Sequence, residues 1–158
     1  MRSSFSWAAM MLAAPSALVL SACATTGPKV TELSACAAYR PAFEVTDRFM
    51  ETFNRKDATA WGETFNFPSV RIASGRTAIL NSAADLEDSF GRLAATGWDH
   101  SAWADRRIVQ CEATKAHMLT TFVRYRKDGS ELSRFNSLYI VELRAGKWGI
   151  TGRSSFAP

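Results

Sequence analysis

The C-terminal segment, residues 124–156, most constrains the fold, because it reads as three strands joined by two very short turns. Its sequence is RYRKDGSELSRFNSLYIVELRAGKWGITGRSSF, in which apolar or aromatic residues alternate with polar ones. This alternation is typical of strands with one buried face. Asp128-Gly129 and Ala145-Gly146 have the composition of two-residue hairpin turns, so consecutive strands should be antiparallel neighbours. The apolar face of such a sheet must be buried against another layer.

The N-terminus has the features of a secretory signal. Residues 1–22 carry one charge, at Arg2, followed by a mostly apolar run shorter than the ~20 apolar residues needed to span a bilayer. The run ends in LSAC at Cys23, which resembles a bacterial lipobox, a signal in which the cysteine is acylated and becomes the first mature residue. Ordinary signal cleavage after Ala24 is the alternative, because the tripeptide around Cys23 also fits the small-x-small rule.

The lipobox interpretation predicts three segments. A lipoprotein signal peptide covers residues 1–22, the lipidated Cys23 and a flexible tether cover 23–38, and one α+β domain covers 39–158. Acyl chains contribute ~0.8 kcal/mol per buried CH₂, so several chains anchor a protein durably to a membrane. The next residue is Ala24 rather than an aspartate, which by resemblance to lipoprotein sorting signals favours the outer membrane. We therefore expect a lipid-anchored protein of the bacterial cell envelope that faces the periplasm.

The charge and motif content argue against several function classes. The net charge is +4, and the basic residues are scattered rather than clustered, which is more typical of a soluble surface than of nucleic-acid binding. The sequence contains no GxGxxG, Walker loop, zinc-spaced cysteine pair or HExxH. We therefore expect no nucleic acid, no metal and no cofactor.

The first half of the domain predicts helices and one hairpin. Pro41 can occupy the first turn of a helix that has its apolar residues along one side. Asp57 is a plausible N-cap for a second, shorter helix. Residues 65–80 read as a β-hairpin with a Ser-Gly turn, and Ser82 starts a third helix that ends at Gly97. The remainder reads as strand.

This order of helix, helix, hairpin, helix and four-stranded meander resembles the SnoaL-like, nuclear transport factor two-like (ketosteroid isomerase-like) superfamily. The resemblance covers residues 42–156 and rests on FNFPSVRIASG in the hairpin and YIVELRAGKWGITGRSSF at the close. It implies an α+β fold, a cone-shaped curved antiparallel sheet with the N-terminal helices packed on its concave face. The superfamily includes both enzymes and non-catalytic members, so the fold alone does not give the function.

The turns also assign side chains to faces, because strand side chains alternate. They pair Lys127 with Ser130 and Arg144 with Lys147. On this register one face is the more aromatic and is the better candidate for the concave side, where the superfamily's helices close over a pocket. We expect the pocket to be lined by Trp103, Asp105, Phe122, Arg124, Ser137, Tyr139 and Ser154.

The two ends of this face should differ. Around Val141, Trp148 and Ile150 the residues are apolar, and we expect solid core there. The pocket end combines aromatic and polar groups, and an apolar cleft with a few convergent polar groups is the usual site of a small ligand. Our first hypothesis is therefore a domain that binds a small, partly apolar molecule without clear catalytic machinery.

Asp105 and Arg124 are the candidate catalytic residues. On the expected register Asp105 lies diagonal to Arg124, ~7 Å away along the backbone, within reach of an arginine side chain. A carboxylate held by arginine can act as a general base, which resembles the superfamily's epoxide hydrolases, although their second carboxylate has no counterpart here. We favour a structural ion pair, and a small-molecule hydrolase or isomerase using Asp105 with Arg124 is the alternative.

Two cysteines, Cys36 and Cys111, remain besides the predicted acylation site. In an oxidising compartment such a pair can form a disulfide, and two unrelated buried thiols are the alternative. The turn EATK places Cys111 opposite Ala116 on the helix-covered face. Because Cys36 precedes a helix that must cross the same face, we predict a disulfide between them.

The opposite face of the sheet should also carry an interaction surface. We expect His117 there, in a surface or interface role, and we expect Arg71 to point away from the core. The apolar patch on this face consists of Leu119, Val123, Leu138 and Ile140. Such patches mark interfaces, and members of the superfamily commonly dimerise through this face, so we expect a homodimer. A non-catalytic dimeric scaffold or interaction module, with side chains filling its cavity, is the third hypothesis.

Overall fold

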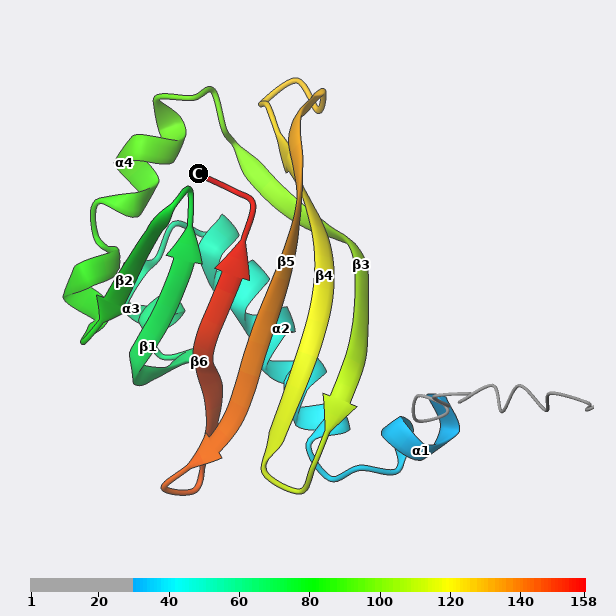
Figure 1. The fold of residues 1–158 in the computed structure, drawn as a ribbon. Coiled ribbons are helices and arrows are strands. Elements are labelled where there is room, and N and C mark those ends of the chain that lie inside the picture. Colours follow the sequence, from blue (N-terminus) through cyan, green and yellow to red (C-terminus); the bar gives the residue numbers. More distant parts are fainter. Residues whose placement is uncertain (1–29) are drawn as a thin grey trace, which may run out of the picture.

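A six-stranded sheet of order β2-β1-β6-β5-β4-β3 organises the protein in a computed structural model, which describes residues 30–158 (Figure 1). The strands are β1 Phe65–Ala73, β2 Arg76–Leu80, β3 His100–Cys111, β4 Lys115–Tyr125, β5 Glu131–Arg144 and β6 Lys147–Ser155. The predicted hairpin and four-stranded meander are confirmed. The sheet is mixed rather than fully antiparallel, because β1 joins the edge of the meander in parallel with β6.

Helices cover one face of this sheet. The helices are α2 Tyr39–Asn54, α3 Ala58–Gly62, the 3-10 helix η1 Ala83–Leu86 and α4 Ser89–Ala94, together with α1 Val30–Ser34, which lies to the side of the sheet beyond β3 (Figure 1). The longest, α2, crosses behind β6, β5 and β4 in the view of Figure 1. It buries Ala42, Val45 and Phe49 in the core shared with the sheet. The predicted α+β cone, with helices on the concave face of a curved sheet, is therefore confirmed.

The segment predicted as one helix from Ser82 to Gly97 consists of two short helices, η1 and α4. It begins as expected, since the Asp85 carboxylate accepts a hydrogen bond from the Ser82 N–H at 3.2 Å. The break falls where Asp88 and Ser89 follow one another, and both residue types have low intrinsic helix propensity.

The residues just before α2 are held on the domain. A disulfide joins Cys36 to Cys111 of β3, with a Cα–Cα distance of 6.1 Å, which is the pairing that the sequence favours. Ala38 is fully buried. The folded part thus starts ahead of residue 39, where we expected the tether to end. The predicted signal peptide and Cys23 lie outside the described residues. Among residues 30–158 there is no helix long and apolar enough to cross a membrane.

Two of the three predicted turns of the meander are correct. Arg144 pairs with Lys147 and Cys111 pairs with Ala116, as expected. These two hairpins therefore start from the register that the sequence predicts.

The turn between β4 and β5 is one residue longer than expected. The Arg126 N–H donates to the Ser130 carbonyl at 2.9 Å, so Lys127 does not pair with Ser130. A bulge beside the turn offsets the difference, and Arg124 pairs with Ser133. From that point β4 and β5 keep the predicted register.

Three further bulges decide which side chains reach the concave face. They leave Ala104 and Val109 unpaired in β3 and Thr151 unpaired between β6 and β5. Each bulge adds one residue to one strand, so the side chains beyond it change face. The alternation of apolar and polar residues in the sequence does not predict the positions of these bulges.

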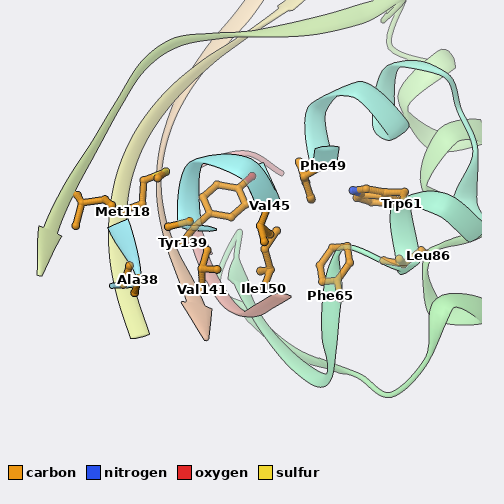
Figure 2. Packing of buried hydrophobic residues seen from close by; sticks show 13 residues of the cluster. Ala38, Val45, Phe49, Trp61, Phe65, Leu86, Met118, Tyr139, Val141 and Ile150 are labelled. Atoms are coloured by element: carbon orange, nitrogen blue, oxygen red, sulfur yellow. The ribbon is translucent and has the colours of Figure 1, made fainter. Parts of the chain in front are cut away.

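One end of the concave face is solid core. Val45, Met118, Val141 and Ile150 meet there, from α2, β4, β5 and β6, and none of the four has exposed surface (Figure 2). Trp148 packs against the same cluster. The core expected around Val141 and Ile150 is confirmed, and we call these four buried residues the apolar end.

Aromatic rings fill the space between the helices and the centre of the sheet. The ring of Phe49 on α2 lies 5.5 Å from that of Trp61, 5.8 Å from that of Phe65 and 5.6 Å from that of Tyr139, measured between centroids. Figure 2 shows these side chains directed toward one another. Tyr139 is the residue where this cluster meets the second end of the concave face.

Candidate functional site

Most of the predicted pocket residues lie together beyond Tyr139 on the concave face. The indole ring of Trp103 packs edge-on against Phe122 at 6.3 Å and Tyr139 at 5.7 Å, and its N–H donates to the Thr46 carbonyl of α2. The residues that the structure brings together here are Trp103, Phe122, Arg124, Ser137 and Tyr139. Their grouping follows from the register of β4 and β5, which the turns predict.

Asp105 does not belong to this group. It pairs with Thr121 on the outer face of the sheet, where it is exposed. The bulge at Val109 moves Asp105 off the concave face, and the bulge at Ala104 returns Trp103 to it. Arg124 extends from the opposite face, so both the expected ion pair and the hypothesis of Asp105 as a base beside Arg124 are wrong.

The bulge at Thr151 exchanges two neighbouring residues of β6. Ser154, which we expected in the pocket, pairs with Leu138 and lies on the outer face. Arg153, which we expected outside, pairs with Tyr139 and points into the concave face. A serine hydroxyl is thereby replaced by a guanidinium group in the site.

Arg71 also lies on the concave face, contrary to our expectation. Along β1, Ser69 is buried whereas Val70 and Ile72 are exposed, so Arg71 shares the alternation of the inward residues. In the parallel ladder between β1 and β6, Arg71 pairs with Arg153. The pairing thus places Arg71 and Arg153 side by side in one row across the sheet.

Two guanidinium groups lie over aromatic rings on this face, and Arg71 is the ladder neighbour of one of them, Arg153. Arg153 Cζ lies 5.2 Å from the ring centroids of both Phe122 and Tyr139. Arg124 Cζ lies 5.9 Å from the Phe122 centroid and 5.0 Å from that of Phe135. Phe122 is therefore shared by two arginines. We call the group of Arg71, Arg124, Arg153, Phe122, Phe135 and Tyr139 the arginine end.

The buried arginines lack acidic partners. Arg124 is only 8% exposed, and its Nε has no hydrogen-bond partner; the same is true of the Nε of Arg153. Within residues 30–158 no aspartate or glutamate side chain forms an ion pair with Arg71, Arg124 or Arg153. Cation–π contacts contribute about 0.5–2 kcal/mol each, which offsets only part of the cost of burying an unpaired charge.

Hydroxyl groups supply the polar contacts at this end. Ser155 Oγ accepts a hydrogen bond from Arg153 Nη2 at 3.0 Å, and it lies 2.7 Å from Ser137 Oγ. Ser155 Oγ also accepts from the Ala157 N–H at 3.0 Å. The serine pair therefore links the arginine end to the segment that follows β6.

That segment closes over the arginine end. Ala157 has no exposed surface and packs with Met50 and Phe122. The Pro158 carbonyl accepts a hydrogen bond from Arg71 Nη2 at 3.1 Å. Figure 1 shows the chain bending away at the end of β6. Residues 157–158 thus present an apolar side chain to the rings and a carbonyl oxygen to an arginine.

The local electrostatics reflect this unbalanced charge. Burial, with Arg153 and Arg71 nearby, lowers the pKa of Arg124 to about 10. Burial and then Arg153 likewise lower the pKa of Arg71. Burial raises the pKa of the Tyr139 hydroxyl, although the three arginines oppose that rise, so Tyr139 is neutral at physiological pH. A negative charge placed here would be stabilised by all three arginines.

A fourth arginine on the same face, Arg106, does have an acidic partner. Arg106 pairs with Thr120 across the β3–β4 ladder, and its Nη1 lies 2.6 Å from Asp47 Oδ1 of α2. The same Nη1 donates to Thr46 Oγ1 at 2.9 Å. The fold therefore contains a matched arginine on the concave face beside the unmatched ones.

A groove of about 300 Å³ lies mainly on the outer face and is lined by Asp105, Arg107, Leu138, Ser154 and Phe156 among others. The cavity that we expected to reach Asp105 is thus a groove on the opposite side of the sheet. His117 lies on this outer face beside Ile140, as expected, and its Nδ1 is 2.7 Å from Gln110 Oε1.

Sequence reasoning missed Arg71 and Arg153 for different reasons. Phe65, Phe67 and Arg71 are an even number of residues apart and therefore lie on the same face of β1. The two aromatic residues indicate that this face is the buried one. For Arg153 the signal is Gly152, because a glycine inside an alternating strand often marks a bulge. Neither signal involves a catalytic motif.

Comparison with known proteins identifies the type of domain. A family model described as NTF2-like protein (DUF6841) matches residues 42–156. No curated protein matches the sequence. Similarity to solved structures is widespread but remote in sequence.

Three solved structures illustrate that similarity. An NTF2-like protein of unknown function from Shewanella oneidensis is 15% identical, with a TM-score of 0.61 over 74% of this chain and 97% of that one. A ketosteroid isomerase-like protein from Erwinia carotovora atroseptica is 20% identical, with a TM-score of 0.55 over 72% and 91%. An NTF2-like protein with a cystatin-like fold from Novosphingobium aromaticivorans is 17% identical, with a TM-score of 0.60 over 81% and 89%. At these identities the similarity concerns the fold.

Proposed function

Because the chain belongs to this NTF2-like family, matched over residues 42–156, we propose that it is a lipid-anchored envelope protein that binds a small, partly apolar ligand at the arginine end of its concave face. The observation that carries the proposal is Arg124, a buried arginine without a hydrogen-bonded or acidic partner beside the rings of Phe122 and Phe135. Buried charge without a partner is costly, and proteins retain such groups mainly at functional sites.

The chemistry of the arginine end supports binding rather than catalysis. Its titratable groups are arginines and Tyr139, and the only carboxylate that we expected as a base, Asp105, is on the other face. Rings beside convergent polar groups are typical of small-ligand sites. We therefore retain ligand binding and give up the hydrolase or isomerase built on Asp105 and Arg124.

The binding proposal is tested by native mass spectrometry of gently purified protein. The wild type should carry a small molecule, and Phe122→Ala should lose it because the shared ring is removed. Tyr125→Ala, on the outer face, is the matched control and should retain it. Loss from Tyr125→Ala with retention by Phe122→Ala would place the ligand on the wrong side of the sheet for this proposal.

The anchor is tested separately. Cys23→Ser should abolish incorporation of labelled palmitate and release the protein from the membrane fraction, because the acylated thiol is removed. A Cys23→Ser variant that stays in the membrane, together with a wild type that incorporates no palmitate, would contradict the lipid anchor.

Dimerisation through the outer face is a second proposal. Within residues 30–158 no helix covers this face, and it exposes Ile79 and Phe156 by 60% and 83%. Leu119, Leu138 and Ile140 lie between them and the far edge of the sheet. Ile140→Asp should convert a dimer to a monomer in light scattering, whereas Arg134→Asp, an exposed polar position, should not. A wild type that is monomeric at high concentration would end this proposal.

A further inference from the structure

We propose that the arginine end is a site for an organic carboxylate with an apolar body, and that residues 157–158 occupy this site until such a ligand displaces them. This inference rests on the proposed binding function and names the class of ligand. It is based on the position of three arginines, the rings between them and the contacts of the segment after β6.

The charge of the site calls for an anion. Arg71 and Arg153 are neighbours in the β1–β6 ladder, and Arg124 and Arg153 share the ring of Phe122. The described residues place no aspartate or glutamate side chain among them, although Asp47 on the same face neutralises Arg106. A negatively charged group is therefore the missing partner, because it would relieve the mutual repulsion of all three guanidinium groups.

The 8% exposure of Arg124 and its unpartnered Nε indicate how that anion would bind. Planar guanidinium groups bind carboxylates through two parallel N–H···O bonds. The Pro158 carbonyl on Arg71 is already a planar oxygen acceptor in this position. A ligand carboxylate would take the place of this acceptor.

The surroundings also select the body of the ligand. Phe122, Phe135, Met50 and Trp103 surround the fully buried Ala157. The side chain of Ala157 therefore occupies the place of an apolar group, next to the carbonyl that occupies the place of the carboxylate. A small inorganic anion would satisfy the arginines but not the rings, and a neutral apolar molecule would do the reverse.

Two polar contacts with described residues hold the segment 157–158. The Ala157 N–H donates to Ser155 Oγ, and Arg71 Nη2 donates to the Pro158 carbonyl. Both contacts involve groups that a carboxylate could use instead. Removal of residues 157–158 should therefore expose the site and strengthen binding.

The test uses phenylacetate as the probe and phenylacetamide as its neutral counterpart. Binding is measured by calorimetric titration and by the change in tryptophan fluorescence, to which Trp103 contributes. We expect phenylacetate to bind and phenylacetamide to bind at least about tenfold more weakly, since a hydrogen bond to a charged group is worth about one to two orders of magnitude. Arg124→Gln and Arg153→Gln should each weaken phenylacetate binding by a similar factor. Arg107→Gln, exposed on the outer face, is the matched control and should not change it.

A structural role for Arg124 predicts a different pattern. Arg124→Gln should keep or raise the melting temperature while losing the probe, whereas an arginine that only supports the fold would lower it. If Arg124→Gln does not fold, Arg124→Lys decides, because it keeps the charge and loses the two-pronged geometry; it should bind more weakly than the wild type. Deleting residues 157–158 should tighten binding severalfold.

Several results would overturn the inference. They are equal binding of the acid and the amide, equal loss in Arg107→Gln and Arg124→Gln, and binding of inorganic phosphate with none of phenylacetate. A co-purified neutral ligand that survives Arg124→Gln would overturn the carboxylate assignment and leave the proposed binding function standing. Absence of any co-purified ligand, with no probe binding to the full or the shortened chain, would end both.

Discussion

The apolar end and the arginine end are built on the same strands and covered by the same helix, but they use burial in opposite ways. At the apolar end Val45, Val141 and Ile150 have no exposed surface and belong to one hydrophobic cluster. At the arginine end Arg124 is nearly as buried and has an unpartnered Nε. The first arrangement stabilises the fold through removal of apolar area from water, and the second costs stability through desolvation of charge.

The difference between the two ends shows where this molecule tolerates the free-energy cost of burying an unpaired charge. A protein whose core is secured at one end can retain an unfavourable group at the other, and such groups concentrate at sites that bind or react. Arg106 shows that the concave face does not require unmatched arginines, since Asp47 of α2 pairs with it. The missing partners of Arg124 and Arg153 are therefore a local property of the arginine end.

The largest effect should come from the disulfide that secures α2 next to the apolar end. Replacing Cys36 and Cys111 together with serine opens a link across 75 residues, and the chain-entropy model gives a loss of about 4 kcal/mol in the free energy of unfolding. Urea denaturation of oxidised protein measures it. Non-reducing peptide mapping of exported protein is the control, and free thiols at both positions would remove this contribution.

A single core substitution should have the next largest effect. Ile150→Ala removes a fully buried side chain at the apolar end and should cost about 3 kcal/mol through lost burial and the cavity left behind. Phe156→Ala, at an exposed position, should change the unfolding free energy by less than about 0.5 kcal/mol. Similar losses in the two variants would mean that the apolar end is not the packed part of the fold.

The arginine end should respond with the opposite sign. Arg124→Met keeps an apolar stem against Phe122 and removes the unmatched charge, so it should raise the free energy of unfolding by on the order of 1 kcal/mol. Arg106→Met leaves Asp47 without its partner and should lower it by a similar amount. The register expected from the sequence, with Asp105 beside Arg124, predicts a loss in both. Thermal denaturation of the Arg124→Met and Arg106→Met variants distinguishes the observed register from the register expected from the sequence.

The smallest effect concerns the outer side of the apolar end. Burial raises the pKa of Glu142, but hydrogen bonds from Lys115 and Arg144 outweigh it and hold the pKa below its ordinary value of 4.5. Because the folded-state pKa is lowered, the stabilisation is present above pH 4.5 and is lost as the pH falls through the folded-state pKa. Glu142→Gln should therefore cost less than about 1 kcal/mol at neutral pH and nothing in strong acid. A cost that does not depend on pH would show that charge is not its source.

The fold was predictable because its signals are local. The turns at Asp128-Gly129 and Ala145-Gly146 identify the meander, and the apolar spacing identifies α2. The pairing of Cys36 with Cys111 follows from the same register near a short turn. Close to a turn there are few residues over which an error of register can arise.

The candidate site was predictable only in part, because it lies farther from the turns. Phe122, Arg124, Ser137 and Tyr139 were placed correctly, since β4 and β5 keep one register over this length. Asp105 was misplaced by the bulge at Val109. One unpaired residue is enough to reverse every assignment beyond it.

The sequence by itself determined the layers of this protein, the order of its strands along the chain, the position of its solid core and its one disulfide among the described residues. Only the tertiary structure decided that Arg71 and Arg153 lie on the concave face with Arg124, whereas Asp105 and Ser154 lie on the outer face. The physical reason is that hydrophobic periodicity specifies elements through many residues at once, whereas a bulge is a single-residue choice made by packing between neighbouring strands. The charge of the site depends on these bulges, because they decide which arginines and carboxylates reach the concave face.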